Sequence, residues 1–255
     1  MNILQAQNIS FAYGKKTILK NIDFSIEQGD VIALLGPNGS GKSTLMKVLL
    51  GLYKAQGEIR LEGKKLSAYS KKEMAQKIAY VPQMHKIPFA YTVLEVVMMG
   101  RLAHTTMFSN YTANDYTIAM QSLEKVGMHA CEKQPYAILS GGQQQLVLIA
   151  RALAQEAKIL FMDEPVNGLD YGNQIKLLRL VKSLAKEGYT FLKTTHYPDH
   201  ALYATNRVAM MQHGEMIGCD KTTSLLTAQT IQMLYGIEVV LEKTKQGVHF
   251  CVPVL

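Results

Sequence analysis

The sequence predicts an α/β fold: a parallel β-sheet core, an antiparallel β subdomain near the N-terminus and an inserted helical subdomain. Three observations support this class: alternating strand-like runs early in the chain, apolar runs without alternation further along, and amphipathic helical patterns between them. We expect one domain over residues 1–255. Its predicted parts are a β subdomain with the first part of the core, a helical subdomain, the rest of the core, and a C-terminal helix with a β-hairpin, at residues 1–85, 86–158, 159–220 and 221–255.

The first part of the chain alternates short β-like runs with turns. The runs are "ILQAQNISFAY", "TILKNIDFSIEQGD" and "GEIRLEG", and glycines separate them. This pattern predicts a small, largely antiparallel sheet.

The predicted core strands are apolar runs that end at polar loops. "VIALLG" precedes a glycine-rich loop and the helical pattern "STLMKVLLGL", while "KILFMDEP" and "TFLKTTH" each follow helical sequence. Because these runs do not alternate, we expect parallel strands with both faces covered by helices.

Two further helices and a hairpin complete the predicted elements. "NDYTIAMQSLEKVG" predicts a helix with Tyr116, Met120, Leu123 and Val126 on one apolar face and Gly127 at its end. "TAQTIQMLYG" predicts a short helix, and the two β-like arms around "TKQG" predict a hairpin.

Residues 88–108, "PFAYTVLEVVMMGRLAHTTMF", are unusually apolar for a surface segment. Thr92 and Glu95 have the spacing of a capping box, which predicts a helix over 93–99 that stops at Gly100. Such a helix is too short to cross a bilayer, so either this chain or a partner must bury it.

Composition excludes several classes of protein. With 48% apolar and 18% charged residues the chain can form a core. It has no apolar run long enough to predict a signal peptide or a membrane span. We therefore expect it to stay in the cytoplasm. The net charge of +7 comes partly from scattered lysine pairs, which favours solvated surface over a nucleic-acid site. The odd, widely spaced cysteines Cys131, Cys219 and Cys251 predict neither disulfides nor a zinc site.

The strongest chemical signal is "GPNGSGKS", which matches the phosphate-binding pattern GxxxxGK(S/T) between a predicted strand and helix. Backbone N–H groups of such a loop surround phosphate oxygens, Lys42 reaches the β and γ phosphates, and Ser43 can ligate magnesium. The predicted nucleotide-binding residues of this segment are Gly36, Pro37, Asn38, Gly39, Ser40, Gly41, Lys42, Ser43 and Thr44.

Two acids follow the predicted strand "ILFM". Asp163 can hold magnesium, and the adjacent Glu164 can polarise an attacking water as a general base. A merely structural role for both acids is the less favoured alternative beside a phosphate loop.

The pentapeptide "LSGGQ" opens another predicted helix with a serine and two glycines. A hydroxyl and free N–H groups at a helix N-terminus form a second anion site, at Ser140, Gly141, Gly142 and Gln143.

Together, "GPNGSGKST", "YVPQ", "LSGGQ", "FMDEP", "NGLD" and "TTH" resemble the ordered motif set of an ATP-binding-cassette (ABC) ATPase over essentially the whole chain. The resemblance implies a P-loop NTPase (RecA-like) fold, with ATP and Mg²⁺ as cofactors. It also implies a head-to-tail dimer of two copies, in which each ATP lies between one copy's phosphate loop and the other copy's "LSGGQ".

The resemblance assigns further roles by position. Tyr13 would stack on adenine, Gln83 would contact magnesium and the attacking water, and His196 would contact the γ-phosphate. Asp170, which ends "NGLD", would belong to the nucleotide site. The histidines His85, His104, His200 and His213 match no motif, and we expect them to be structural.

Two positions depart from the pattern of the family. Asn167 stands where a serine that reaches across the dimer is common, which puts the coupling between the two sites in doubt. Gln144 stands where a basic residue is common after the "LSGGQ" motif.

Residues 88–108 and the C-terminal tail are similar to those of importer ATPases for iron-siderophore complexes, haem, cobalamin and molybdate. The resemblance implies transmembrane permease subunits, an extracytoplasmic substrate-binding protein that acts indirectly, no nucleic acid, and a peripheral place at the cytoplasmic face of the membrane. In that family the permeases dock near this region, so the resemblance favours burial of residues 93–99 by a partner. The alternatives are a soluble ABC ATPase acting on nucleic acid or ribosomes and an exporter cassette.

Overall fold

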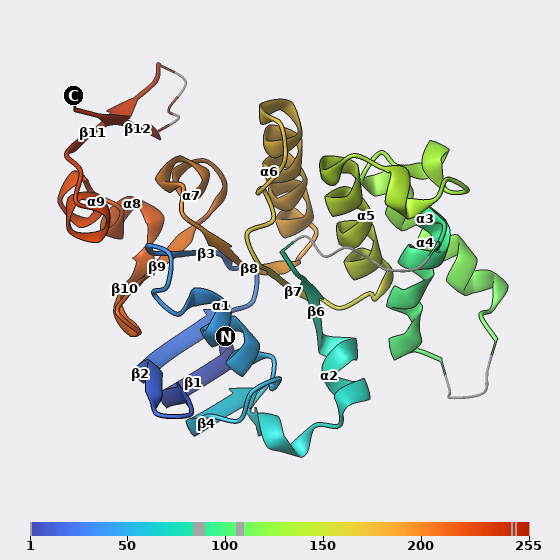
Figure 1. The fold of residues 1–255 in the computed structure, drawn as a ribbon, viewed down its shortest axis with the longest axis horizontal. Helices are drawn as coiled ribbons and strands as arrows, with labels where there is room; N and C mark the ends of the chain where they lie inside the picture. The colour runs from blue at the N-terminus through green and yellow to red at the C-terminus, as the bar shows by residue number, and fades with distance from the viewer. Residues whose placement is uncertain (1, 84–89, 106–109, 246, 248, 255) are drawn as a thin grey trace. The chain divides into compact units, whose positions relative to one another are not determined.

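The computed structural model describes residues 2–83, 90–105, 110–245, 247 and 249–254 (Figure 1). The chain divides into two compact units, the first made of 1–69 with 181–255 and the second of 70–180. The subdivision predicted from the sequence, with a helical part at 86–158, stays a prediction.

The first unit contains the predicted antiparallel sheet. Its strands follow the order β2-β1-β4-β5, with bounds Lys16–Glu27, Asn2–Tyr13, Gln56–Leu61 and Lys64–Lys65. Alternate side chains of β1 such as Leu4 and Ala6 are buried, as the period of a half-buried strand requires. A short 3₁₀ helix, η1 (Leu66–Ala68), follows β5.

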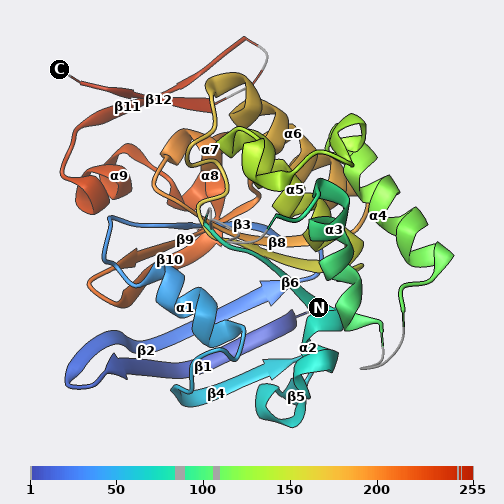
Figure 2. The same cartoon turned by 45° about the vertical axis from the view of Figure 1, so that its right-hand side comes forward.

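A second sheet of the first unit carries the phosphate loop. Strand β3 (Val31–Leu35) pairs in parallel with β8 (Thr190–Thr195) and β9 (Arg207–Gln212), and β10 (Glu215–Lys221) is antiparallel to β9. The predicted strands at β3 and β8 are confirmed, and every side chain of both is buried. Helix α1 (Lys42–Leu49) follows β3 and lies beside β2 (Figure 2).

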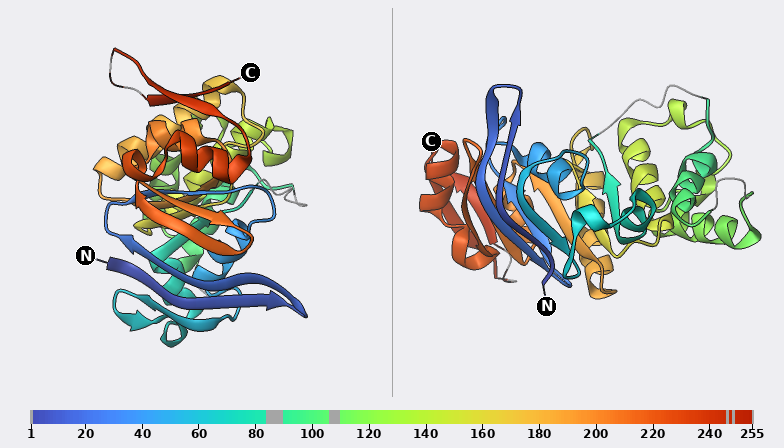
Figure 3. Two further views of the ribbon diagram at one scale, coloured as in Figure 1. Left: turned by 90° about the vertical axis from the view of Figure 1, so that its left-hand side faces the viewer. Right: turned by 90° about the horizontal axis from the view of Figure 1, so that it is seen from below.

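The C-terminal part of the first unit packs on this second sheet. Its elements are α7 (Pro198–Ala204), α8 (Thr222–Leu225), α9 (Ala228–Tyr235), β11 (Val239–Lys243) and β12 (His249–Pro253). Strands β11 and β12 form the predicted hairpin, a separate two-stranded sheet (Figure 3). The core beneath combines Ala33 and Leu35 with Ala201, Ile231 and Leu234.

The second unit contains a parallel strand pair and a group of helices. Strand β6 (Ile78–Val81) pairs with β7 (Ile159–Met162), and α2 (Lys71–Lys77) precedes β6. Helices α3 (Val93–Met98), α4 (Ala113–Lys125) and α5 (Gly141–Ala154) pack against one another. The 3₁₀ helices are η2 (Met99–Ala103), η3 (His129–Cys131) and η4 (Tyr136–Ile138), and α6 (Tyr171–Lys186) begins in this unit.

The apolar helix at 93–98 is buried by this chain, so the favoured sequence interpretation, burial by a partner, is wrong. Val93, Val96 and Val97 are fully buried and Met98 is 3% exposed, because α3 packs against α4 and α5 within the second unit. The predicted capping box of Thr92 and Glu95 is confirmed. Residues 88–89 and 106–108 of the apolar segment lie outside the described residues, as does His85.

The sequence predicted that the helix stops at Gly100. Instead, the chain continues past this residue as the 3₁₀ helix η2, which ends at Ala103. A Cβ atom at Gly100 would lie 2.2 Å from the carbonyl oxygen of Arg151. The glycine therefore serves the close approach of η2 to α5 rather than a helix end.

The buried face of α4 is rotated from the predicted one. Tyr116 is 48% exposed, whereas Asp115 and Ala119 are buried with Leu123. The rotation follows from Asp115, which caps the helix through Thr112 and pairs with the buried Arg101. The predicted end at Gly127 is confirmed by its left-handed backbone.

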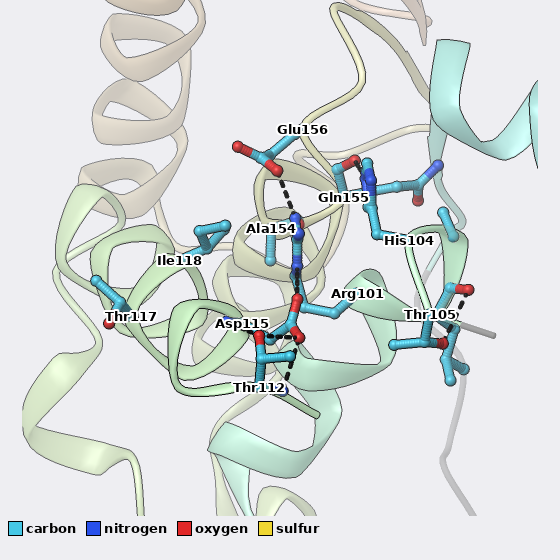
Figure 4. A network of polar contacts seen from close by, with 12 residues as sticks. Arg101, His104, Thr105, Thr112, Asp115, Thr117, Ile118, Ala154, Gln155 and Glu156 are labelled. Atoms are coloured by element: carbon cyan, nitrogen blue, oxygen red, sulfur yellow. Dashed lines mark hydrogen bonds and ion pairs between the residues drawn. The ribbon is translucent and has the colours of Figure 1, made fainter. Parts of the chain in front are cut away.

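Arg101 connects three segments of the second unit (Figure 4). Its Nε donates to Asp115 Oδ1 at 2.8 Å, and its Nη1 donates to Ala154 O and Glu156 Oε2, each at 2.7 Å. The guanidinium thus joins η2 to the start of α4 and to the end of α5. A buried ion pair of this kind is costly to break because it leaves an uncompensated charge.

Over the described ranges, no helix has both the length and the apolar character needed to cross a bilayer. The three cysteines, all of them described, are free thiols.

Candidate nucleotide site

The phosphate loop closes on itself through contacts that only glycine permits. A Cβ atom at Gly36 would lie 2.2 Å from the carbonyl oxygen of Met211 and 2.7 Å from Ser40 Oγ. Gly41, with φ 103°, adopts a left-handed conformation that a side chain would strain. The loop backbone therefore follows β9 closely and turns directly into α1.

Lys42 and Ser40 give the loop its polar interior. Lys42 is 5% exposed, and its Nζ donates to the carbonyl oxygens of Gly36 at 2.8 Å and Pro37 at 3.0 Å. Ser40 is 3% exposed, and its hydroxyl has no hydrogen-bond partner within the described part of the chain. A buried, unsatisfied hydroxyl in the loop that also carries Lys42 fits a phosphate oxygen as the missing partner.

Helix α1 begins without a side-chain cap, as α7 and α8 also do. Helices α2, α3, α4, α5 and α9 start with capping boxes, but Gly41 precedes α1 and no described side chain caps it. This helix start lacks a side-chain cap, and the helix dipole favours negative charge there.

Tyr13 and His196 are further site residues of the first unit. Tyr13 ends β1 and is 48% exposed, with its ring against Phe11 and Tyr53. His196 directly follows β8, and its ring lies 4.1 Å from that of Tyr197, centroid to centroid. His196 lies at the carboxyl end of a parallel strand, where such sheets present their functional side chains, whereas Tyr13 ends a strand of the antiparallel sheet.

The two acids lie in the second unit, at the end of β7. Asp163 is 5% exposed, its N–H donates to Val81 O at 2.9 Å, and Tyr80 donates to its carboxylate at 3.5 Å. Glu164 has φ 45°, a left-handed conformation that is unusual for a side chain of its size. Such strain is found most often at functional sites.

The structure brings Gln83, Glu164 and Asn167 together. Gln83 Nε2 donates to Glu164 Oε2 at 3.2 Å, and Asn167 Nδ2 donates to the same oxygen. The backbone supports the cluster, because Asn167 N–H donates to Glu164 O at 3.1 Å. The sequence predicted a role for Gln83 and Glu164 but gave no signal that Asn167 would contact the acid.

The predicted metal ligands have the chemistry that magnesium prefers. Ser43 offers a hydroxyl in the first unit, while Gln83 and Asp163 offer amide and carboxylate oxygens in the second. Hard oxygen donors suit Mg²⁺, and a buried carboxylate such as Asp163 is a strong ligand for it. The donor set therefore fits the metal.

The "LSGGQ" segment starts α5. Ser140 Oγ accepts from Gln143 N–H at 3.3 Å, and Gln143 Oε1 accepts from Ser140 N–H at 3.0 Å. Gly142 is buried, with a Cβ atom there 3.3 Å from Leu169 Cδ2. Gln144, the departure after this motif, donates to Tyr136 O at 3.2 Å and so anchors α5 to η4.

Asp170 is exposed and caps α6. Its Oδ1 accepts from Asn173 N–H at 2.8 Å and its Oδ2 accepts from Asn173 Nδ2 at 2.7 Å. In the isolated chain this acid therefore stabilises the first turn of α6.

Comparison with known proteins agrees with these features. The family described as "ABC transporter" matches residues 19–167. The molybdate import ATP-binding protein MolC of Haemophilus influenzae is 36% identical over 237 residues, covering 92% of this chain and 88% of that protein. The ferric enterobactin transport ATP-binding protein FepC of Escherichia coli is 32% identical over 253 residues, covering 98% and 93%.

A solved structure resembles the whole chain. It is described as an inward-facing conformation of an ABC transporter assigned to the metal-chelate type, with a TM-score of 0.87 and 33% identity, covering 100% of this chain and 98% of the other. The hemin import ATP-binding protein HmuV of Deinococcus radiodurans is 36% identical over 241 residues, covering 92% and 91%. The phosphate loop, the "LSGGQ" helix and these matches show that the chain belongs to the ABC transporter family, as one of its ATP-binding subunits.

Proposed function

We propose that this chain is the ATP-hydrolysing subunit of an importer for a metal or metal chelate. The observation that carries the nucleotide part is the phosphate loop, where buried Ser40 lacks a described partner and α1 begins without a side-chain cap. The import part is supported by relatives that are named for molybdate, hemin and ferric enterobactin.

In this proposal, ATP binds to the first unit through its base and its phosphates. Tyr13 stacks on adenine, Lys42 and the loop N–H groups hold the phosphates, and His196 contacts the γ-phosphate. Ser140 and Gly142 of a second copy complete the site, with Asp170 nearby.

Glu164 is the proposed general base for the attacking water. Amide donors on Glu164 Oε2 orient the carboxylate, which would accept the proton from the attacking water. Ser43, Asp163 and Gln83 would hold Mg²⁺, which neutralises charge on the phosphates.

The assembly follows from the family. We propose that two copies dimerise head to tail on permease subunits at the cytoplasmic face of the membrane, supplied by an extracytoplasmic binding protein. Since this chain does not contact the substrate, a candidate metal or chelate is recognised by its stimulation of ATP hydrolysis in the reconstituted complex.

Substitution of Glu164 tests the proposed chemistry. We expect Glu164→Gln to lower ATP turnover by roughly 10²- to 10⁴-fold, because general-base assistance is lost while the amide keeps the shape of the side chain. The variant should also accumulate an ATP-bound dimer in size-exclusion chromatography, which wild type does not.

The matched control is Glu62→Gln, since Glu62 also has a left-handed backbone, with φ 49°, but lies outside the motifs. It should hydrolyse ATP as wild type does. Wild-type turnover in Glu164→Gln, or loss of turnover without an ATP-bound dimer, would contradict the proposal.

A further inference from the structure

Three aromatic rings meet beside the phosphate loop in the first unit. Phe11 and Tyr13 lie at the end of β1, and Tyr53 lies in the turn after α1. The rings of Phe11 and Tyr53 are stacked, with centroids 5.3 Å apart and planes at 13°. The Tyr13 ring stands edge-on to both, at 4.8 Å from Phe11 and 5.6 Å from Tyr53.

Polar contacts fix the same cluster. Hydrogen bonding to Tyr53, with burial and the Tyr53 charge acting in the same direction, raises the pKa of Tyr13, while a hydrogen bond with Thr44 opposes the rise. Lys47 Nζ lies 5.9 Å from the centroid of the Tyr53 ring. Thr44 and Lys47 both belong to α1, so Thr44 connects Tyr13 to this helix and Lys47 connects Tyr53 to it.

We propose that Tyr53 is a positioning residue that holds the ring of Tyr13 in the orientation that receives adenine. The inference rests on the proposed function, in which Tyr13 stacks on the base. The side chain of Tyr13 is about half exposed, so solvent alone would leave it several rotamers. Two perpendicular ring contacts restrict it to one, which lowers the entropy lost when the base binds.

Phe11 and Tyr53 differ in how they act. Phe11 lies on the same strand as Tyr13, whereas Tyr53 reaches the ring from the end of α1. Tyr53 therefore adds an aromatic contact from the end of α1 to the hydrogen bond that Thr44 of the same helix makes with Tyr13. The proposed role of Tyr53 concerns binding of the base and not of the phosphates. A loss of this role can therefore be distinguished from a general effect on α1, which would change phosphate binding as well.

The experiment compares two ligands, MgATP and magnesium tripolyphosphate, which carries no base. In Tyr53→Leu we expect MgATP binding to weaken roughly 3- to 10-fold by calorimetry, the range that one aromatic contact supports. Binding of tripolyphosphate should change less than about 2-fold, a difference well below one aromatic contact. Tyr53→Phe keeps the ring and should restore most of the MgATP affinity. Tyr116→Leu, which removes a half-exposed aromatic from α4, is the control.

A fluorescent reporter makes the ring contact visible. The chain contains no tryptophan, so Tyr13→Trp introduces a single tryptophan at the platform, which can be excited selectively over the tyrosines. We expect MgATP to quench this emission and tripolyphosphate to leave it unchanged. Adding Tyr53→Leu to the reporter should raise the MgATP concentration needed for half-quenching by the same roughly 3- to 10-fold.

The outcomes separate the two levels of the hypothesis. If wild type binds neither ligand, or if MgATP never quenches the reporter, the proposed nucleotide function or the role of Tyr13 fails. If both hold and Tyr53→Leu binds MgATP as wild type does, Tyr53 is not a positioning residue. Equal weakening of MgATP and tripolyphosphate would also overturn it, because the effect would then lie in the phosphate loop.

Discussion

At the scale of single residues, the most informative side chain is Asn167. The sequence marked it as a departure from the family pattern at a position expected to reach a second copy. Within this chain its amide donates to Glu164, on the oxygen that Gln83 also reaches. A hydrogen bond to a charged group is worth about 1.5–3 kcal/mol, enough to orient a carboxylate.

Removing that amide should reduce the rate of hydrolysis. We expect Asn167→Ala to lower kcat roughly 10-fold with little change in the KM for ATP, because the acid loses an amide donor that orients it. Asn167→Ser keeps a hydroxyl donor and should lie between alanine and wild type. Steady-state ATPase assays check this, and a rise in KM at unchanged kcat would assign Asn167 to nucleotide binding instead.

At the scale of elements, hydrogen bonds at the N-termini stabilise several helices of the second unit. Helices α2 to α5 each begin with a capping box, and the sequence spacing predicted this for α3. The Arg101 network then joins η2, α4 and α5. Hydrogen bonds from Thr112, together with the ion pair to Arg101, lower the pKa of Asp115 to about 2.

This lowered pKa predicts a pH window for stability. Above pH about 4 Asp115 is ionised in both the folded and unfolded chain and its favourable contacts are fully present. As pH falls from about 4 to about 2 the unfolded chain takes up the proton first, so this stabilisation is lost. Asp115→Asn should therefore be less stable than wild type at pH 7, and the difference should shrink toward pH 2.

Urea unfolding of the two proteins between pH 7 and pH 2 measures the difference. Glu124→Gln changes an exposed acid of the same helix and should follow wild type throughout. A difference between Asp115→Asn and wild type that does not depend on pH would show that the lost contacts are independent of the charge.

At the scale of the whole molecule, one buried charge stands out in the core. Lys193 lies on β8 and is 2% exposed, and its Nζ donates to His200 O at 3.4 Å. Burial lowers the pKa of Lys193 to about 7. Between pH 7 and pH 10 the unfolded chain therefore binds more protons than the folded chain, and stability rises with pH across this range.

Replacing the lysine should remove that dependence. We expect Lys193→Met to be as stable as wild type or more stable at pH 7, because methionine fills a similar volume without a charge to bury. Wild type should gain roughly 3–4 kcal/mol more than the variant between pH 7 and pH 10. Urea unfolding at both pH values checks this, with the exposed Lys54→Met as control. Parallel pH profiles would contradict it.

The sequence predicted the elements that carry strong local signals. The runs at β3, β7 and β8, the glycine-rich loop and the hairpin at the C-terminus are confirmed because apolar continuity and turn residues are local properties. Strands β9 and β10 were missed, since the methionine-rich "RVAMMQ" resembles no single pattern. Burial of α3 by a partner and the buried face of α4 were wrong predictions, because both depend on packing within the second unit.

The sequence predicted the residues of the candidate site to about the same extent as it predicted the fold. Motif spacing identified Lys42, Glu164 and Ser140, whose chemistry depends on short segments of chain. The contact of Asn167 with Glu164 and the packing of Tyr53 against Tyr13 join residues of unrelated motifs or distant positions. Such contacts leave no periodic signal in a single sequence.

The left-handed backbone of Glu164 has a consequence for how this chain can change over generations. Holding a bulky residue at φ 45° costs roughly 1–2 kcal/mol, and glycine at that position would release this energy. Selection for a more durable protein would thus favour loss of the acid, and selection for turnover must keep it. The same residue that would activate water also makes the folded chain less stable than it could be.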